Sequence, residues 1–135
     1  MSDTVVVREN GQGRYQQEVI SGEHRFVADE PVSVGGADAG PAPFDFLMAG
    51  LGACTSMTLR MYAERKGLAL TRISVSLTHD KVEVDGEKRD LIRRTLTLDG
   101  ELTPEQRARL VEIAGRCPVA RALSKPLLLE CGVAD

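Results

Sequence analysis

The chain contains no tryptophan, and its 135 residues include only two tyrosines and three phenylalanines. Proteins that bind single-stranded nucleic acid usually stack the bases on aromatic side chains, so this scarcity argues against such a function. A formal net charge of −3 gives no general attraction to nucleic acid or to an anionic membrane surface. The segment MSDTVVVREN lacks the basic stretch and apolar run of a signal peptide, so we expect the protein in the cytoplasm.

Cysteine is also scarce, and it occurs only as Cys54, Cys117 and Cys131. Three cysteines without CxxC spacing do not form the disulfide scaffold of a small secreted protein. The two histidines, His24 and His79, lie far from the cysteines in the sequence, so we expect neither a metal site nor a cofactor. In a reducing cytosol, buried cysteines are most often small core residues, and that interpretation stays open here.

The stretch 41–67, PAPFDFLMAGLGACTSMTLRMYAERKG, organises the chain. Its first half is apolar on every side of a helical wheel, with Asp45 as the single charge, which predicts a helix buried all round. The apolar run is much shorter than the ~20 residues that cross a bilayer, so the burial is expected within protein. Gly50 and Gly52 lower intrinsic helicity, so their presence predicts a close crossing by another element.

The flanking patterns predict a single α+β domain over residues 1–135. Runs of alternating strands are separated by runs of helix, which favours antiparallel sheets packed around the long buried helix over a doubly wound parallel sheet. The Gly- and Pro-rich segment 29–43 is expected to be an irregular loop with a functional role. The other expected elements are strands at Thr4–Glu9, Arg14–Ser21, Glu23–Ala28, Leu70–Val84 and Arg89–Leu98, helices starting near Thr103 and Cys117, and a closing strand at Pro126–Cys131.

Two of the cysteines differ in their expected surroundings. Cys117 precedes a proline and several helix-forming residues, so it should start a short helix whose free N–H groups favour a thiolate, and Arg116 and Arg121 act in the same direction. Cys54 lies within the apolar helix, where burial disfavours a thiolate unless a cation is close. Such a cation could be held by Asp45 through a bidentate pair. The candidates on the N-terminal strands are Arg8, Arg14 and Arg25.

Other polar residues have ordinary interpretations. The charged run from Glu87 to Arg94 is typical of a solvated face. Thr55 begins the polar positions that follow Cys54, where the helix is expected to emerge from the core.

The segments GPAPFDFLMAGLGACTSMTLRMYAERKG and GRCPVARAL together resemble the OsmC/Ohr family of thiol peroxidases, in particular its small OsmC-like proteins. The resemblance extends from about Asp29 to the C-terminus. It implies an α+β fold and an intertwined homodimer with sites at the subunit interface. In that family a mid-helix cysteine attacks an organic hydroperoxide, a second cysteine closes a disulfide with the resulting sulfenic acid, and a dithiol such as a lipoyl group reduces it.

Carried over residue by residue, the resemblance assigns Cys54 as the peroxidatic cysteine, which meets the peroxide, and Cys117 as the resolving cysteine. Asp45 falls near the position of the family's glutamate but is one methylene shorter. Arg14 is our choice for the assisting arginine, with Arg8 as the alternative. The implied function is reduction of alkyl or fatty hydroperoxides through a Cys54 sulfenic acid that Cys117 resolves as a disulfide.

The chain also departs from the family pattern. Many relatives carry a histidine where this chain has Ala120, a difference that bears on peroxidase strength, and Cys131 has no counterpart in the motif. A second class of function therefore stays open, a dimeric binding module with an apolar pocket and structural cysteines. Neither class predicts a nucleic-acid or membrane partner.

Overall fold

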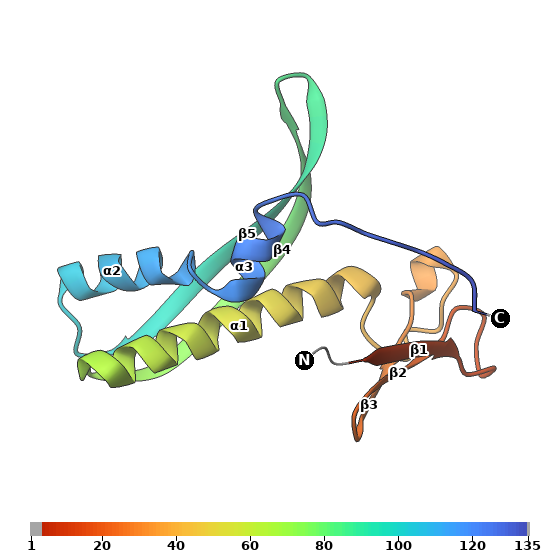
Figure 1. The fold of residues 1–135 in the computed structure, drawn as a ribbon, viewed down its shortest axis with the longest axis horizontal. Coiled ribbons are helices and arrows are strands. Elements are labelled where there is room, and N and C mark those ends of the chain that lie inside the picture. The colour runs from red at the N-terminus through yellow and green to blue at the C-terminus, as the bar shows by residue number, and fades with distance from the viewer. Residues whose placement is uncertain (1–3, 135) are drawn as a thin grey trace. The chain divides into compact units, whose positions relative to one another are not determined.

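The structure, a computed structural model, describes residues 4–134 and has a mixed α+β architecture with antiparallel sheets and one long central helix, as the sequence predicts (Figure 1). The described residues form two compact units that adjoin in the sequence between Leu47 and Met48. None of the helices among these residues is long and apolar enough to cross a membrane. In chain order the elements are β1 (Val5–Glu9), β2 (Gln17–Ser21), β3 (His24–Ala28), the 3-10 turn η1 (Val32–Val34), α1 (Pro43–Lys66), β4 (Leu70–Val84), β5 (Glu87–Gly100), α2 (Pro104–Ala114) and α3 (Pro118–Leu123).

The first unit contains a three-stranded antiparallel meander in the order β1-β2-β3. Val7 of β1 lies opposite Val19 of β2, which places apolar side chains next to one another across the strand pair. The predicted Asn-Gly turn connects these strands, and the side chain of Asn10 accepts a hydrogen bond within it at 2.9 Å. The three predicted strands are therefore confirmed, although the second begins at Gln17 instead of Arg14.

Asp29 organises the loop between β3 and α1. Its carboxylate accepts hydrogen bonds from the backbone N–H groups of Glu30 at 2.8 Å and of Ala37 and Ala39 at 3.1 Å each. The bond from Ala39 is the main cause that holds the pKa of Asp29 below its usual value, and burial works against it. The Gly- and Pro-rich segment is thus an ordered loop built around one carboxylate, with η1 as its only helical turn.

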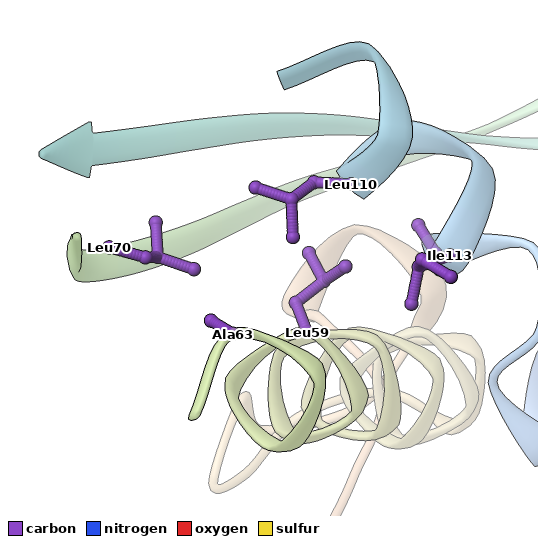
Figure 2. Packing of buried hydrophobic residues seen from close by; sticks show 6 residues of the cluster. Leu59, Ala63, Leu70, Leu110 and Ile113 are labelled. Atoms are coloured by element: carbon purple, nitrogen blue, oxygen red, sulfur yellow. The ribbon is translucent and has the colours of Figure 1, made fainter. Parts of the chain in front are cut away.

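The second unit has its main core between α1, α2 and the β4–β5 hairpin. Figure 2 shows Leu59 of α1 pointing toward Leu110 and Ile113 of α2, with Leu70 of β4 beside them. Leu59 and Leu110 have no exposed surface, and Ala63 completes the α1 side of the cluster. This core holds α1 against the hairpin and α2 within the unit.

The long helix α1 begins at Pro43 and ends just before Gly67, as predicted. The prediction that its first half is buried all round is wrong for the chain by itself, because Phe44 and Leu47 are 43% and 38% exposed. The sequence of an apolar helix does not reveal whether each of its faces is covered by the same chain or by another chain. The buried positions instead follow one face of the helix, at Leu51, Gly52, Thr55, Leu59 and Ala63.

The predicted closing strand at Pro126–Cys131 is also wrong, because this segment has no regular secondary structure. Leu128 and Leu129 are 96% and 88% exposed. The apolar pattern of PLLLEC suits a strand, but a strand also needs a neighbour that pairs with its backbone N–H and C=O groups. Among residues 4–134 this segment has no such partner.

Candidate functional site

Cys54 and Cys117 pack against one apolar cluster in the second unit, although they lie far apart in the sequence. The buried members of the cluster are Leu51, Cys117 and Ala120, and the half-buried Cys54 packs against them. Both cysteines are free thiols. Cys117 has no exposed surface, so Cys54 is the more accessible thiol of the pair. The apolar side chains that complete the surroundings are Leu77, Ile92, Val119 and Leu123.

Cys117 is the N-cap residue of α3, in agreement with its predicted place at the start of a short helix. Its Sγ atom accepts a hydrogen bond from the backbone N–H of Ala120 at 3.3 Å. Burial works against the thiolate, but this hydrogen bond lowers the pKa of Cys117 below its ordinary value. Hydrogen bonds from Cys54 and Thr55 and the positive charge of Arg94 lower that pKa further. The surroundings therefore favour a thiolate on Cys117.

Thr55 connects the two cysteines, since it follows Cys54 in the chain and contacts Cys117 in space. Its hydroxyl donates to the carbonyl oxygen of Leu51 at 2.7 Å, and its Oγ1 lies 3.8 Å from Sγ of Cys117. Our expectation that Thr55 begins a polar, emerging face is wrong, because it is fully buried. A threonine can satisfy its hydroxyl by bonding to the carbonyl one turn earlier, and this allows it to lie inside the core.

Arg94 of β5 supplies the cation at this site. Its Nη1 atom donates hydrogen bonds to Oγ1 of Thr55 and to the carbonyl oxygen of Ala114, both at 2.9 Å. Ala114 is the last residue of α2, and its carbonyl oxygen also accepts the backbone N–H of Cys117 at 3.5 Å. The interpretation of the charged run up to Arg94 as a solvated face is therefore wrong for this residue, which is half-buried and bonded within the site.

The sequence contained a signal for Arg94 that our reasoning missed. Successive side chains of a strand point to opposite faces, so Arg93 and Arg94 cannot share one solvated face. Arg94 lies in phase with Leu96, which packs on the main core, and Arg93 is exposed. The arginines that we expected near Cys117 from the sequence, Arg116 and Arg121, are both exposed.

Arg14 and Asp45, the other two predicted site residues, belong to the first unit. The carboxylate of Asp45 accepts the backbone N–H of Ala42 at 3.0 Å, which closes the first turn of α1. The guanidinium of Arg14 lies over the ring of Tyr15, 4.9 Å from its centroid, as a cation–π contact. The functional roles of both residues stay predictions.

The alternative arginines, Arg8 and Arg25, share one partner. Both donate to the carboxylate of Glu18, at 3.1 and 2.9 Å. The hydrogen bond from Arg8 is the main cause that keeps the pKa of Glu18 below its usual value, with burial acting against it and Arg25 adding to it. The third cysteine, Cys131, is exposed in the segment that follows α3.

Fold and site together define an α+β protein with one thiol on its central helix and a second thiol packed on the same apolar cluster. A family model described as OsmC-like protein matches residues 35–131, which is most of the chain. The protein therefore belongs to the OsmC/Ohr family. A search of curated protein sequences found no match.

Solved structures of the same fold include proteins from several bacteria. An OsmC-like protein from Mycoplasma pneumoniae is 20% identical with a TM-score of 0.72, covering 91% of this chain and 86% of its own. An organic hydroperoxide resistance protein OsmC from Legionella pneumophila is 17% identical with a TM-score of 0.71, covering 91% and 89%. The organic hydroperoxide resistance protein OhrB of Bacillus subtilis is 21% identical with a TM-score of 0.66, covering 94% and 93%. At these identities the likeness shows the fold.

Proposed function

We propose that this protein is a thiol-dependent peroxidase that reduces organic hydroperoxides. One observation carries the proposal: the accessible Cys54 and the buried Cys117 pack on one cluster, with polar contacts that favour a negative charge on sulfur. Membership of a family that includes organic hydroperoxide resistance proteins supports it. Leu77 and Ile92 pack on the same cluster as Cys54, and such apolar side chains favour alkyl or fatty hydroperoxides over small polar ones.

The proposed reaction proceeds in three balanced steps. The Cys54 sulfur attacks the peroxide, the O–O bond breaks, and the products are a Cys54 sulfenic acid and an alkoxide that takes up a proton to become the alcohol. Cys117 then attacks the sulfenic sulfur, forming the disulfide and releasing hydroxide, which leaves as water. A dithiol, of which a lipoyl group is one example, donates two electrons and two protons to restore both thiols.

Arg14 and Asp45 are proposed as assisting residues in the first step. A guanidinium near the reacting sulfur stabilises its thiolate and the charge that develops on the leaving oxygen. Of the three candidate arginines, Arg8 and Arg25 already donate to a carboxylate, whereas Arg14 makes a cation–π contact. This difference supports the choice of Arg14.

A homodimer is part of the proposal. Two features of the single chain support it: the exposed methionines on α1, Met57 and Met61, and the exposed leucines after α3, Leu128 and Leu129. A second copy would bury such surfaces, which monomeric proteins rarely leave open as contiguous patches. A reducing compartment such as the cytoplasm would supply the dithiol that the last step needs.

The test measures consumption of cumene hydroperoxide in the presence of dihydrolipoamide. We expect turnover by the wild type and none by Cys54→Ser, while Cys117→Ser should react once and then accumulate over-oxidised Cys54. Cys131→Ser is the matched control and should turn over like the wild type. An inert wild type, or a Cys54→Ser variant that is equally active, would contradict the peroxidase.

Thiol titration after an equimolar dose of cumene hydroperoxide separates the peroxidase from the binding module. Loss of the Cys54 and Cys117 thiols, with a mass decrease of two hydrogens, supports the enzyme. Unchanged thiols and an unchanged mass support a binding module with structural cysteines.

A further inference from the structure

We propose that Arg94 is a positioning residue for Cys117: it holds the Cys117 backbone in place through the Ala114 carbonyl, and it favours the Cys117 thiolate through the Thr55 hydroxyl. This thiolate is then in place to attack Cys54 once that residue has become a sulfenic acid. The attack on the sulfenic acid rests on the proposed function, whereas the protonation state of Cys117 does not. Arg94 acts on the backbone of Cys117 through the first of these groups and on its sulfur through the second.

The first intermediate group is the carbonyl oxygen of Ala114. It accepts one hydrogen bond from Nη1 of Arg94 at 2.9 Å and another from the backbone N–H of Cys117 at 3.5 Å. One oxygen at the end of α2 therefore ties the Cys117 backbone to a side chain of β5. On β5, Arg94 lies opposite Leu77 of β4, so its own backbone is held in the ladder of a long hairpin.

The second intermediate group is the hydroxyl of Thr55, which has one proton to donate and two lone pairs to accept with. Arg94 donates to one lone pair at 2.9 Å, and the proton goes to the Leu51 carbonyl oxygen at 2.7 Å. The Thr55 oxygen lies 3.8 Å from Sγ of Cys117, and either atom can be the donor of a hydrogen bond between them. When Cys117 is a thiolate, the same hydroxyl can turn its proton from Leu51 to the sulfur.

The charge of Arg94 strengthens this arrangement. A hydroxyl that accepts a hydrogen bond from a guanidinium is polarised and becomes a better donor to the thiolate. The site is shielded from water, since Thr55 and Cys117 have no exposed surface, so the attraction between guanidinium and thiolate is screened less than at the surface. The backbone N–H of Ala120 is a further donor to the same sulfur, at 3.3 Å.

A thiolate on Cys117 matters for the resolving step. The Cys117 sulfur attacks the sulfenic sulfur of Cys54, the S–S bond forms, the S–O bond breaks, and hydroxide leaves and is protonated to water by an acid in the solution. A thiolate performs this attack and a thiol does not, so a larger thiolate fraction shortens the life of the sulfenic acid. A shorter life leaves less time for a second hydroperoxide to oxidise Cys54 to the sulfinic acid.

The first experiment follows the ultraviolet absorbance of the thiolate against pH in Cys54→Ser/Cys131→Ser protein, where Cys117 is the single thiol. Adding Arg94→Gln should raise the midpoint of the Cys117 titration by about one pH unit. At pH values below both midpoints, the thiolate fraction should then be about tenfold smaller. Arg93→Gln is the matched control, because it removes the same charge from the exposed neighbour, and it should leave the midpoint unchanged. Arg94→Lys keeps the charge and should recover part of the shift.

An unchanged midpoint in Arg94→Gln, or an equal shift in Arg93→Gln, overturns the proposal. If Arg94→Gln loses its circular dichroism spectrum, Thr55→Val replaces it, since valine keeps the shape but removes the hydroxyl that transmits the effect. Thr55→Val should then raise the midpoint in the same direction, while Thr55→Ser should not. An unchanged midpoint in Thr55→Val equally overturns the proposal.

The second experiment treats otherwise native protein with excess cumene hydroperoxide and measures its products by mass spectrometry. Arg94→Gln should contain a larger share of Cys54 sulfinic acid, and a smaller share of disulfide, than the wild type or Arg93→Gln. Equal shares in Arg94→Gln and the wild type overturn the resolving role. A wild type that does not react with hydroperoxide overturns the proposed function, and the pH titration still decides the role of Arg94.

Discussion

Gly52 of α1 lies directly against Leu77 of β4. A Cβ atom built on Gly52 would stand 2.8 Å from Cδ1 of Leu77, closer than side chains normally approach. Gly50 lies two residues earlier, on the opposite side of the helix. A Cβ atom built on Gly50 would have no neighbour within 4 Å. The expectation that two glycines mark a close crossing is therefore confirmed for Gly52 and wrong for Gly50. The element that crosses α1 at Gly52 is therefore β4, whose Leu77 also packs on the cluster that contains the two cysteines.

These two glycines give a matched pair of substitutions. We expect Gly50→Ala to raise the free energy of unfolding by about 1 kcal/mol, because alanine favours the helix and meets no neighbour. Gly52→Ala gains the same helix propensity but must displace Leu77, and overpacking of this kind costs about 1–3 kcal/mol. Gly52→Ala should thus be no more stable than the wild type. Urea unfolding of the three proteins measures this, and equal stabilisation by both substitutions would count against the crossing.

The start of α2 should respond to a single hydroxyl. Thr103 accepts the backbone N–H of Gln106 at 3.1 Å, and the Gln106 side chain accepts the N–H of Thr103 at 2.9 Å, which completes a capping box. Thr103→Ala should lower the free energy of unfolding by about 1 kcal/mol. Thr103→Ser keeps the acceptor and is the control. Thermal unfolding followed by circular dichroism checks both, and a loss of equal size in the serine variant would exclude the cap as its cause.

The features that could be predicted from the sequence are those determined by residues close together in the chain. The capping box at Thr103, the proline at Pro43 and the Cys117-Pro118 pair each specify a helix start through contacts within one turn. The long β4–β5 hairpin follows in the same way from alternation and a short connection.

The features that could not be predicted depend on which faces meet in space. No spacing in the sequence encodes that Arg94 reaches Thr55 and Ala114 at once, because this requires the register of β5 and the placement of two helices. The closing strand at Pro126–Cys131 failed for a related reason, since propensity alone does not provide a pairing partner. The burial of α1 was overestimated because an apolar face gives no information on what covers it.

Asp29 should make stability depend on pH. Its folded-state pKa is lowered, chiefly by the hydrogen bond from Ala39, so its stabilising effect is present above the unfolded pKa of about 3.9 and is lost as the pH falls through the folded pKa. Asp29→Asn cannot accept through its amide nitrogen, so it should be less stable than the wild type at neutral pH. The difference should shrink below about pH 4.

The control for Asp29 is Asp38→Asn in the same loop. This substitution removes the same charge, and asparagine tolerates the positive φ of 55° at that position. Urea unfolding between neutral and acidic pH compares the three proteins. If Asp29→Asn and Asp38→Asn lose stability equally at neutral pH, the effect comes from charge in general and not from the hydrogen bonds of Asp29.

The exposed face of α1 should determine the association state. Met57 and Met61 are one turn apart and line one groove with Ile73 of β4. If a second copy covers this groove, Met61→Lys must desolvate a charge on association, and the dimer dissociation constant should rise by about tenfold or more. Val111→Lys places the same charge at a valine of α2 that is 61% exposed, and it should leave the constant unchanged. Sedimentation equilibrium at micromolar concentration measures both. If the wild type sediments as a monomer, the dimer is excluded. If Met61→Lys and Val111→Lys change the dissociation constant equally, the α1 groove is not the specific site of association.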